Sequence, residues 1–312
     1  MTDLQDRLRG IAVGAAVGDA LGMPLEFHPP RAEYERVSEM LDGPLPAGCF
    51  TDDTEMALAL AESLLAASPL DAHDLIGRFV IWYRSHPEDI GIHTSAVLAK
   101  IDAGVPVTEA VRQVQALEPD SAGNGSLMRA WPIAIARHNN ESLLAAETRI
   151  QSEITHAHPD CTNGSLLFNL ILYHLLHSNE HSTDAALRLA IARAVDQVSL
   201  GEDFAVVVNL APLRQAVDLK NSGWVCHTIE SALWAVQTTR SFEEALVRVI
   251  NLGNDADTAG AVAGAIAGAL YGLSHIPQRW RQAVHGEYPI RTGKLWFEQD
   301  FIQLADRLAA LE

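Results

Sequence analysis

The chain has 312 residues, of which 48% are hydrophobic and 20% are charged, a composition far from that of disordered proteins. Its 22 Lys and Arg residues against 40 Asp and Glu residues give a formal charge of -18, which excludes the broad basic surface that non-specific nucleic-acid binding needs. We find no run of about 18 predominantly apolar residues and no signal region behind the first residues. We therefore expect a cytoplasmic protein that has no membrane partner.

Apolar residues recur at three- and four-residue spacing along nearly the whole chain, a pattern that predicts helices. Turn signals such as Ser68-Pro69 and His158-Pro159 separate the predicted helices. In chain order, these helices cover residues 4–20, 54–67, 72–84, 93–103, 107–116, 126–137, 142–154, 160–177, 183–196, 204–217, 227–237, 242–250, 257–271 and 294–311. No linker or change in composition divides the sequence, so we predict a single all-α domain over residues 1–312.

Two of the predicted helices carry a glycine at every fourth position. The first series is Gly10, Gly14, Gly18 and Gly22, and the second is Gly260, Gly264, Gly268 and Gly272. Glycine inside a helix costs about 1 kcal/mol relative to alanine, so each series needs a compensating role. A four-residue spacing places each series on one helix face, where the missing side chains let another backbone approach. We predict that the two helices pack through these faces at the centre of the domain, which would bring their ends together.

Acidic residues gather at the start of two predicted helices. Thr51, Asp52 and Asp53 precede the helix near residue 56, and Asp255, Asp257 and Thr258 lie at the start of the second glycine-bearing helix. One interpretation is helix capping, because Thr and Asp side chains accept hydrogen bonds from the first N–H groups of a helix. Capping explains one or two acids per helix and does not readily explain an Asp pair at each.

Metal binding is the other interpretation, and we favour it. Successive residues of a regular helix point about 100° apart, so each Asp pair can converge on one point only from a loop or an irregular first turn. Four carboxylates brought together repel one another strongly unless cations neutralise them. A set of oxygen ligands suits Mg²⁺ or Mn²⁺ rather than zinc.

Five motifs follow one another along the chain. They are Gly14-Ala-Ala-Val-Gly18-Asp-Ala-Leu-Gly22 with Pro24-Leu25-Glu26-Phe27, then Phe50-Thr-Asp-Asp-Thr54, then Gly123-Asn-Gly-Ser-Leu-Met-Arg129, then Thr155-His156, then Gly253-Asn-Asp-Ala-Asp-Thr258. In this order they resemble the motifs of the ADP-ribosylglycohydrolase family, from about residue 10 to about residue 272. The resemblance implies a compact, orthogonal multi-helix all-α domain. Its central cleft would hold two Mg²⁺ or Mn²⁺ ions and remove ADP-ribose from a modified side chain.

The resemblance also assigns roles to individual residues. The implied metal ligands are Thr51, Asp52, Asp53, Asp255, Asp257 and Thr258, which the charge argument had already selected. Glu26 matches an acid that lies over the metals and acts in proton transfer or gating, although its position also suits a solvated loop carboxylate. Asp89 is similar to an acid that arginine-type bacterial members place beside the substrate, although ordinary turn chemistry also explains it. The catalytic residues implied are Glu26, Asp52, Asp89 and Asp257.

A glycine-rich loop is expected to bind the substrate. Gly123 and Gly125 let backbone N–H groups approach phosphate oxygens, and the start of the helix expected after Ser126 favours an anion. A structural glycine turn explains the local sequence equally well. The residues that the resemblance assigns to the diphosphate and ribose are Ser121, Gly123, Asn124, Gly125 and His156. Ala122 stands where some members have an aromatic residue.

Together these expectations describe a metal-dependent hydrolase that reverses mono-ADP-ribosylation of proteins, with arginine the favoured linkage. One alternative keeps the enzyme and changes the substrate to ADP-ribosyl-serine, a nucleic-acid adduct or O-acetyl-ADP-ribose, because cleft walls and loops set substrate choice. Another is a binding or immunity protein that neutralises an ADP-ribosylating toxin. The complete set of six ligand candidates argues against loss of the chemistry, and the overall acidity disfavours a nucleic-acid substrate.

Overall fold

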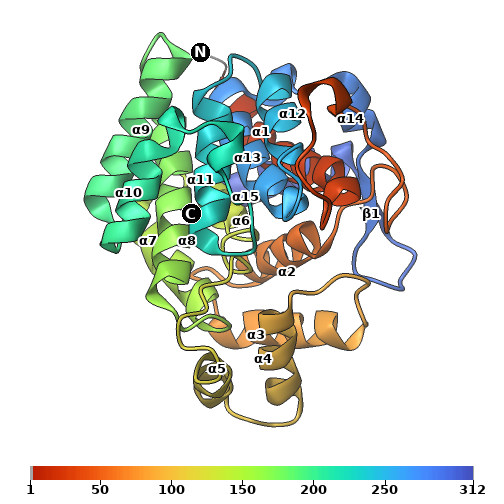
Figure 1. The fold of residues 1–312 in the computed structure, drawn as a ribbon. Helices are drawn as coiled ribbons and strands as arrows, with labels where there is room; N and C mark the ends of the chain where they lie inside the picture. The colour runs from red at the N-terminus through yellow and green to blue at the C-terminus, as the bar shows by residue number, and fades with distance from the viewer. Residues whose placement is uncertain (1–2, 312) are drawn as a thin grey trace.

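The computed structural model describes residues 3–311, and helices dominate this part of the chain (Figure 1). The helices are α1 (Leu4–Gly22), α2 (Asp52–Ala66), α3 (Ala72–Arg84), α4 (Ile92–Asp102), α5 (Val107–Gln115), α6 (Trp131–Ala136), α7 (Glu141–Glu153), α8 (Pro159–Leu176), α9 (Thr183–Gln197), α10 (Glu202–Leu210), α11 (Val225–Gln237), α12 (Phe242–Ile250), α13 (Ala256–Tyr271), α14 (Gln278–Ala283) and α15 (Glu298–Ala309). The strands β1 (His285–Glu287) and β2 (Leu295–Phe297) form an antiparallel pair in which His285 lies opposite Phe297. The prediction of an all-α fold is confirmed.

Most helix positions agree with the sequence analysis, and four segments differ. One is α14, which lies where no helix was predicted. The helix expected from residue 126 begins at Trp131, because residues 124–130 form turns that Asn124 anchors through its backbone oxygen. The helix expected to run to residue 217 ends at Leu210, shortly before Pro212, which has no N–H to continue it. The segment 295–297 was predicted as helix and pairs with β1 instead.

The glycine series of α1 and α13 pack directly against each other, which confirms the predicted contact. A Cβ added at Gly14 would lie 2.4 Å from the carbonyl oxygen of Gly264, and one at Gly18 would lie 2.0 Å from that of Gly260. The reverse contact is equally close, since a Cβ at Gly264 would lie 2.0 Å from the oxygen of Gly14. Real Cβ atoms are not found at such distances, so only glycine permits this approach. Figure 1 shows the two helices in the middle of the molecule.

The pairing is antiparallel, so the end of α1 meets the beginning of α13. Gly10 lies against Gly268 at one end of the contact, and Gly22 lies against Ala256 at the other. The loop that follows α1 is then joined to the loop before α13 by two backbone hydrogen bonds, Phe27 N to Asn254 O and Asn254 N to His28 O, both 2.7 Å. Two segments more than 200 residues apart in the sequence are thereby brought to one place.

One segment corrects the expectation that the chain has no apolar run long enough to cross a membrane. Residues Leu4–Leu25 are long and apolar enough to cross a membrane by length and composition alone. In the fold, 94% of the residues in the most hydrophobic window of this segment are buried inside the protein. Such burial is typical of a core helix in a globular protein.

The α1–α13 contact gives a direct test on stability. We expect Gly264→Ala to lower the free energy of unfolding by about 1–3 kcal/mol, because its Cβ would overlap the backbone of α1. Chemical denaturation monitored by circular dichroism measures the change. Gly77→Ala is the matched control: Gly77 lies within α3 with nothing within 4 Å of an added Cβ, so alanine should be neutral or stabilise by up to about 1 kcal/mol. Equal stability of Gly264→Ala and the wild type would contradict the packing described.

Candidate active site

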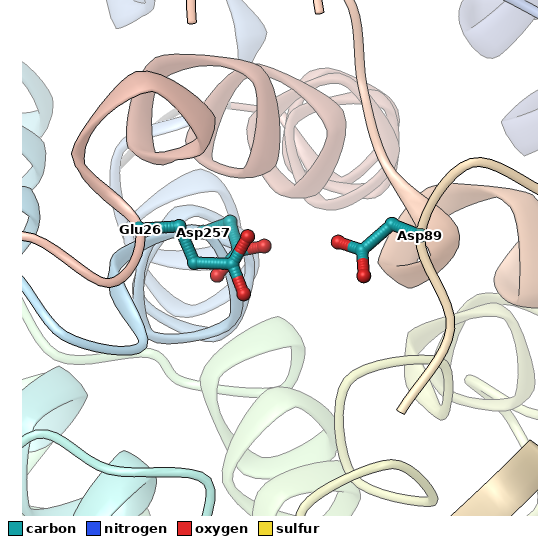
Figure 2. Close-up of side chains that lie close together, drawn as sticks. All are labelled: Glu26, Asp89 and Asp257. Atoms are coloured by element: carbon teal, nitrogen blue, oxygen red, sulfur yellow. The ribbon is translucent and has the colours of Figure 1, made fainter. Parts of the chain in front are cut away.

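Three acids from separate parts of the chain converge beside the α1–α13 contact. The carboxylate oxygens of Glu26, Asp89 and Asp257 lie within 4.8 Å of one another. Figure 2 shows Glu26 and Asp257 side by side, with Asp89 facing them from the loop between α3 and α4. Asp257 is buried, whereas Glu26 and Asp89 are half-buried, so this acid cluster is open to solvent on one side.

The six predicted metal ligands lie at the starts of α2 and α13. Asp52 and Asp53 are the first two residues of α2, and Asp257 and Thr258 occupy the first turn of α13. The two helix starts are in contact, because the Thr258 hydroxyl donates a hydrogen bond of 3.2 Å to Asp53 Oδ2. The starts of α2 and α13 therefore lie against each other, which places acids of the two predicted pairs near one another.

Capping explains these acids only in part: Asp257 Oδ1 accepts a hydrogen bond of 2.9 Å from the backbone N–H of Thr258, in the first turn of its own helix. The N-cap residues Thr51 and Asp255 accept no capping hydrogen bond from the N–H groups of their own helices. The side chain of Asp19, from α1, takes that place at α2 by accepting hydrogen bonds from the backbone N–H groups of Thr51 and Thr54, at 3.0 and 3.1 Å. The carboxylates of Asp52 and Asp53 are therefore not used to cap α2, and both lie near other acids whose charges raise their pKa values.

Asp19 was not among the site residues selected from the sequence. It is fully buried, and besides the two N–H groups it accepts hydrogen bonds from the hydroxyls of Thr51 (2.9 Å) and Thr54 (2.5 Å). Because the Thr51 hydroxyl gives its hydrogen to Asp19, its oxygen lone pairs remain available on the other side. The available signal was an acid inside an otherwise apolar, glycine-bearing helix, where an apolar residue would be expected.

One buried oxygen within the site supports the binding of a divalent cation. Asp53 Oδ1 is buried and has no hydrogen-bond partner within residues 3–311. Buried carboxylate oxygens without a partner are costly, and a cation is the partner that an oxygen-only set would accept. This buried oxygen therefore fits the partnership that a cation would provide.

The raised pKa values of the clustered acids also support cation binding. Burial raises the pKa of Asp52, Asp53 and Asp257 well above the usual range, and neighbouring carboxylates raise each further. The largest neighbour contribution comes from Asp89 for Asp52, from Asp257 for Asp53 and from Glu26 for Asp257. Burial followed by repulsion from Asp89 raises the pKa of Glu26 to about 8. The acids thus oppose one another's ionisation, as expected of a site that needs positive charge.

The glycine loop is tied to the acids by Asn124. Its amide nitrogen donates to Asp255 Oδ2 at 2.5 Å and to the hydroxyl of Thr228 at 2.9 Å. Gly125 packs tightly, since a Cβ there would lie 3.0 Å from Thr94 Oγ1 and 3.1 Å from the ring of His156. The expectation that the N-terminus of a helix after Ser126 faces an anion is wrong, because α6 begins at Trp131 and turns fill the gap.

His156 and Ser121 flank this loop in different ways. His156 is buried, its ring stacks on that of His93 with centroids 4.7 Å apart, and its Nε2 lies toward Gly123 and Gly125. Ser121 is held by its backbone oxygen, which accepts a hydrogen bond from Gln115.

An aromatic side chain missed by the sequence analysis lies beside the loop. Trp224 forms an isolated antiparallel bridge with Gly123 and is 40% exposed. Ala122 is buried, and its backbone oxygen accepts a hydrogen bond from Val225 N. In the sequence, this contact was indicated only by a tryptophan that follows Ser222-Gly223, and such a residue carries little information without the fold.

Comparison with known proteins identifies the family. The sequence matches the ADP-ribosylglycohydrolase family over residues 1–312. The chain belongs to this family. It is 34% identical to the ADP-ribosylarginine hydrolase Tri1 of Pseudomonas putida, covering 89% of this chain and 74% of that protein. It is 33% identical to the ADP-ribosyl-[dinitrogen reductase] glycohydrolase of Rhodospirillum rubrum, covering 89% and 90% of the two chains.

A solved structure agrees with these sequence relationships. An ADP-ribosylglycohydrolase-related protein complex contains a chain that superposes with a TM-score of 0.81 and 32% sequence identity, covering 100% of this chain and 99% of that one. The resemblance drawn from the five motifs is therefore confirmed, and so is the expectation of a hydrolase that removes ADP-ribose from modified substrates.

The raised pKa values give the protein a defined pH dependence when cations are withheld. The pKa values are raised to about 6 for Asp19 and Asp255 and to about 8 for Glu26 and Glu55, against about 4 in an unfolded chain. The folded state keeps protons that the unfolded state releases, so the stabilisation is complete below about pH 4 and is lost as the pH rises through these values. We expect the Tm in chelator to fall between about pH 7 and about pH 9, as Glu26 and Glu55 ionise. Below about pH 7 the histidines whose pKa values burial lowers act in the opposite direction; they are His93, His138, His156 and His227.

Differential scanning calorimetry in chelator and in Mn²⁺ measures this effect. Mn²⁺ should raise the Tm most at the upper end of the range, where more of the carboxylates are ionised and mutual repulsion is greatest. A Tm in chelator that rises steadily from about pH 7 to about pH 9 would contradict the electrostatic account.

Proposed function

We propose that this protein is a divalent-metal-dependent ADP-ribosylarginine hydrolase that releases ADP-ribose from modified protein side chains. The observation that carries the proposal is the meeting of the acid-rich starts of α2 and α13, with a buried oxygen of Asp53 left without a partner. The arginine linkage is supported by the relatives, two of which are named ADP-ribosylarginine hydrolases at 34% and 33% identity.

The proposed ligands are the six side chains at the two helix starts: Thr51, Asp52, Asp53, Asp255, Asp257 and Thr258. Two Mg²⁺ or Mn²⁺ ions bound there would activate water and hold the ribose hydroxyls. Glu26 reaches the same place from the loop after α1 and is half-buried, a position suited to accepting a proton from the attacking water.

The reaction replaces one bond at the anomeric carbon by another. A water oxygen bonds to that carbon, the bond from carbon to the arginine nitrogen breaks, and the products are ADP-ribose and unmodified arginine. Positive charge grows on the ribose ring in an oxocarbenium-like transition state, which nearby carboxylates stabilise. Asp89, which faces Glu26 across the cluster, is placed to attract the guanidinium of the substrate (Figure 2).

The glycine loop binds the other end of the substrate in this proposal. Backbone N–H groups at Gly123 and Gly125 and the side chain of His156 would contact the diphosphate. Asn124 sets the spacing between the two ends, because its side chain bonds to Asp255 and its backbone N–H donates to Gly223 O at 3.0 Å. Ser121 would contact the distal ribose.

Release of free ADP-ribose from an arginine-ADP-ribosylated protein tests the linkage. The assay is run with Mg²⁺ or Mn²⁺ and then with excess chelator, alongside a serine-linked substrate. We expect metal-dependent release from arginine and little or none from serine. Release from serine alone would keep the metal site and overturn the arginine assignment, and binding without release from either would favour the toxin-neutralising alternative.

Single substitutions test the proposed ligands. Asp52→Ala and Asp257→Ala should each lower kcat by more than about 100-fold, the usual limit for groups that only support a metal ligand. Helical circular dichroism should stay close to that of the wild type. Asp306→Asn serves as the control, because this acid of α15 pairs with Arg9 of α1 and its substitution should leave kcat unchanged. Undiminished turnover in Asp52→Ala or Asp257→Ala would remove that residue from the site.

A further inference from the structure

A buried arginine lies behind the substrate loop without a carboxylate in hydrogen-bond contact. Arg129 is completely buried, and its guanidinium lies 4.4 Å from the centre of the Phe79 ring. Its Nε donates to Gln151 Oε1 at 3.0 Å, and one terminal nitrogen donates to Gln151 O at 2.8 Å and to Thr155 Oγ1 at 2.6 Å. Burying a guanidinium is costly, so its retention at this position calls for a role.

The hydroxyl of Thr155 connects Arg129 to His156. It lies 2.6 Å from the arginine nitrogen and 2.8 Å from His156 Nδ1. Arginine can only donate hydrogen bonds, so the Thr155 oxygen is the acceptor in that contact. Within the described residues the hydroxyl hydrogen has no other acceptor than His156 Nδ1, and an unused buried hydroxyl hydrogen would be costly. The hydrogen therefore lies between Thr155 and Nδ1, with the histidine nitrogen accepting.

This direction decides where the histidine carries its own proton. A neutral imidazole has one N–H, so an accepting Nδ1 places the proton on Nε2. Nε2 is the ring nitrogen that faces the substrate loop: it lies 3.2 Å from the Cβ position of Gly125 and 3.6 Å from that of Gly123. The ring thus presents a donor on the side where an anionic substrate oxygen would bind.

His93 also supports this arrangement, together with the burial of the His156 ring. His93 stacks on the His156 ring, and its Nε2 lies 3.0 Å from the backbone oxygen of Thr155, which can only accept. The pKa of His156 is lowered well below its usual value by burial first and then by His93 and Arg129. Burial lowers the pKa of Arg129 to about 9, so the guanidinium stays charged at neutral pH while the imidazole stays neutral.

We propose that Arg129 and Thr155 are positioning residues that fix His156 as its Nε2–H tautomer, so that the neutral ring donates one hydrogen bond to an anionic oxygen of the ADP-ribosyl substrate at residues 123–125. The substrate part rests on the proposed function, whereas the tautomer is a property of the free protein. The opposite tautomer would present a lone pair to the same oxygen and repel it.

Nitrogen NMR on ¹⁵N-histidine-labelled protein at neutral pH reads the tautomer directly. His156→Gln identifies the His156 signals by their loss. We expect the wild type to show a protonated Nε2 and an unprotonated Nδ1. A wild-type ring protonated on Nδ1 would overturn the proposal whether or not the protein hydrolyses ADP-ribosylarginine.

Substitutions at Thr155 separate this role from simple packing. Thr155→Val keeps the side-chain shape and removes the hydroxyl, so it should mix or reverse the tautomers and raise KM about tenfold, with kcat changed much less. Thr155→Ser keeps the hydroxyl and should restore both the tautomer and KM. Thr239→Val is the control, because its buried hydroxyl bonds to Ala235 O in α11 and should affect neither readout. An unchanged His156 tautomer in Thr155→Val would overturn the positioning role of Thr155.

The outcomes distinguish this inference from the proposed function. If the protein has the Nε2–H tautomer and releases no ADP-ribose from arginine, the positioning role of Arg129 and Thr155 stands and the assigned substrate is wrong. Conversely, metal-dependent release from arginine together with an unshifted KM in Thr155→Val would keep the function and remove the positioning role.

Discussion

The contact between the backbones of α1 and α13 is the constraint on which the candidate site depends. Seven glycines on the two helices face carbonyl oxygens of the partner at distances that leave no room for a Cβ. Since the pairing is antiparallel, the loop carrying Glu26 and the start of α13, with Asp255 and Asp257, are forced to the same end of the pair. The helical cost of each glycine, about 1 kcal/mol, is offset by close packing that also assembles the chemistry.

Asp19 joins this contact to the second helix start. It follows Gly18 on α1 and accepts four hydrogen bonds from Thr51 and Thr54 at the beginning of α2. One buried carboxylate therefore performs the capping that local side chains would otherwise perform. The cost of gathering further acids next to it is visible in their raised pKa values, and bound cations would relieve that cost.

Much of this organisation could be predicted from the sequence. Three- and four-residue periodicity gave most helices, and the four-residue glycine spacing gave the α1–α13 contact. The acid pairs at two helix starts and the ordered motifs predicted the residues that the fold brings together. These signals are local or repeat along the chain, so they survive without knowledge of the tertiary structure.

What the sequence could not supply depends on contacts between distant segments. The hydrogen bonds of Asp19 to α2, the bridge of Trp224 to Gly123 and the stacking of His93 on His156 each join residues from separate elements. The turn at residues 126–130 was mistaken for helix because its apolar residues, such as Leu127 and Met128, are buried by neighbouring helices rather than by a regular helix face. The β1–β2 pair is too short to give a clear alternating pattern.

Counting the Mn²⁺ ions bound per chain tests the central claim most directly. Equilibrium dialysis of the wild type against Mn²⁺, with electron paramagnetic resonance of the bound ions, is compared with Asp53→Asn, which changes the carboxylate that has a buried oxygen without a partner. The account predicts two ions in the wild type, magnetically coupled to each other, and loss of at least one in Asp53→Asn. No bound Mn²⁺ in the folded wild type, or equal binding in the variant, would contradict it.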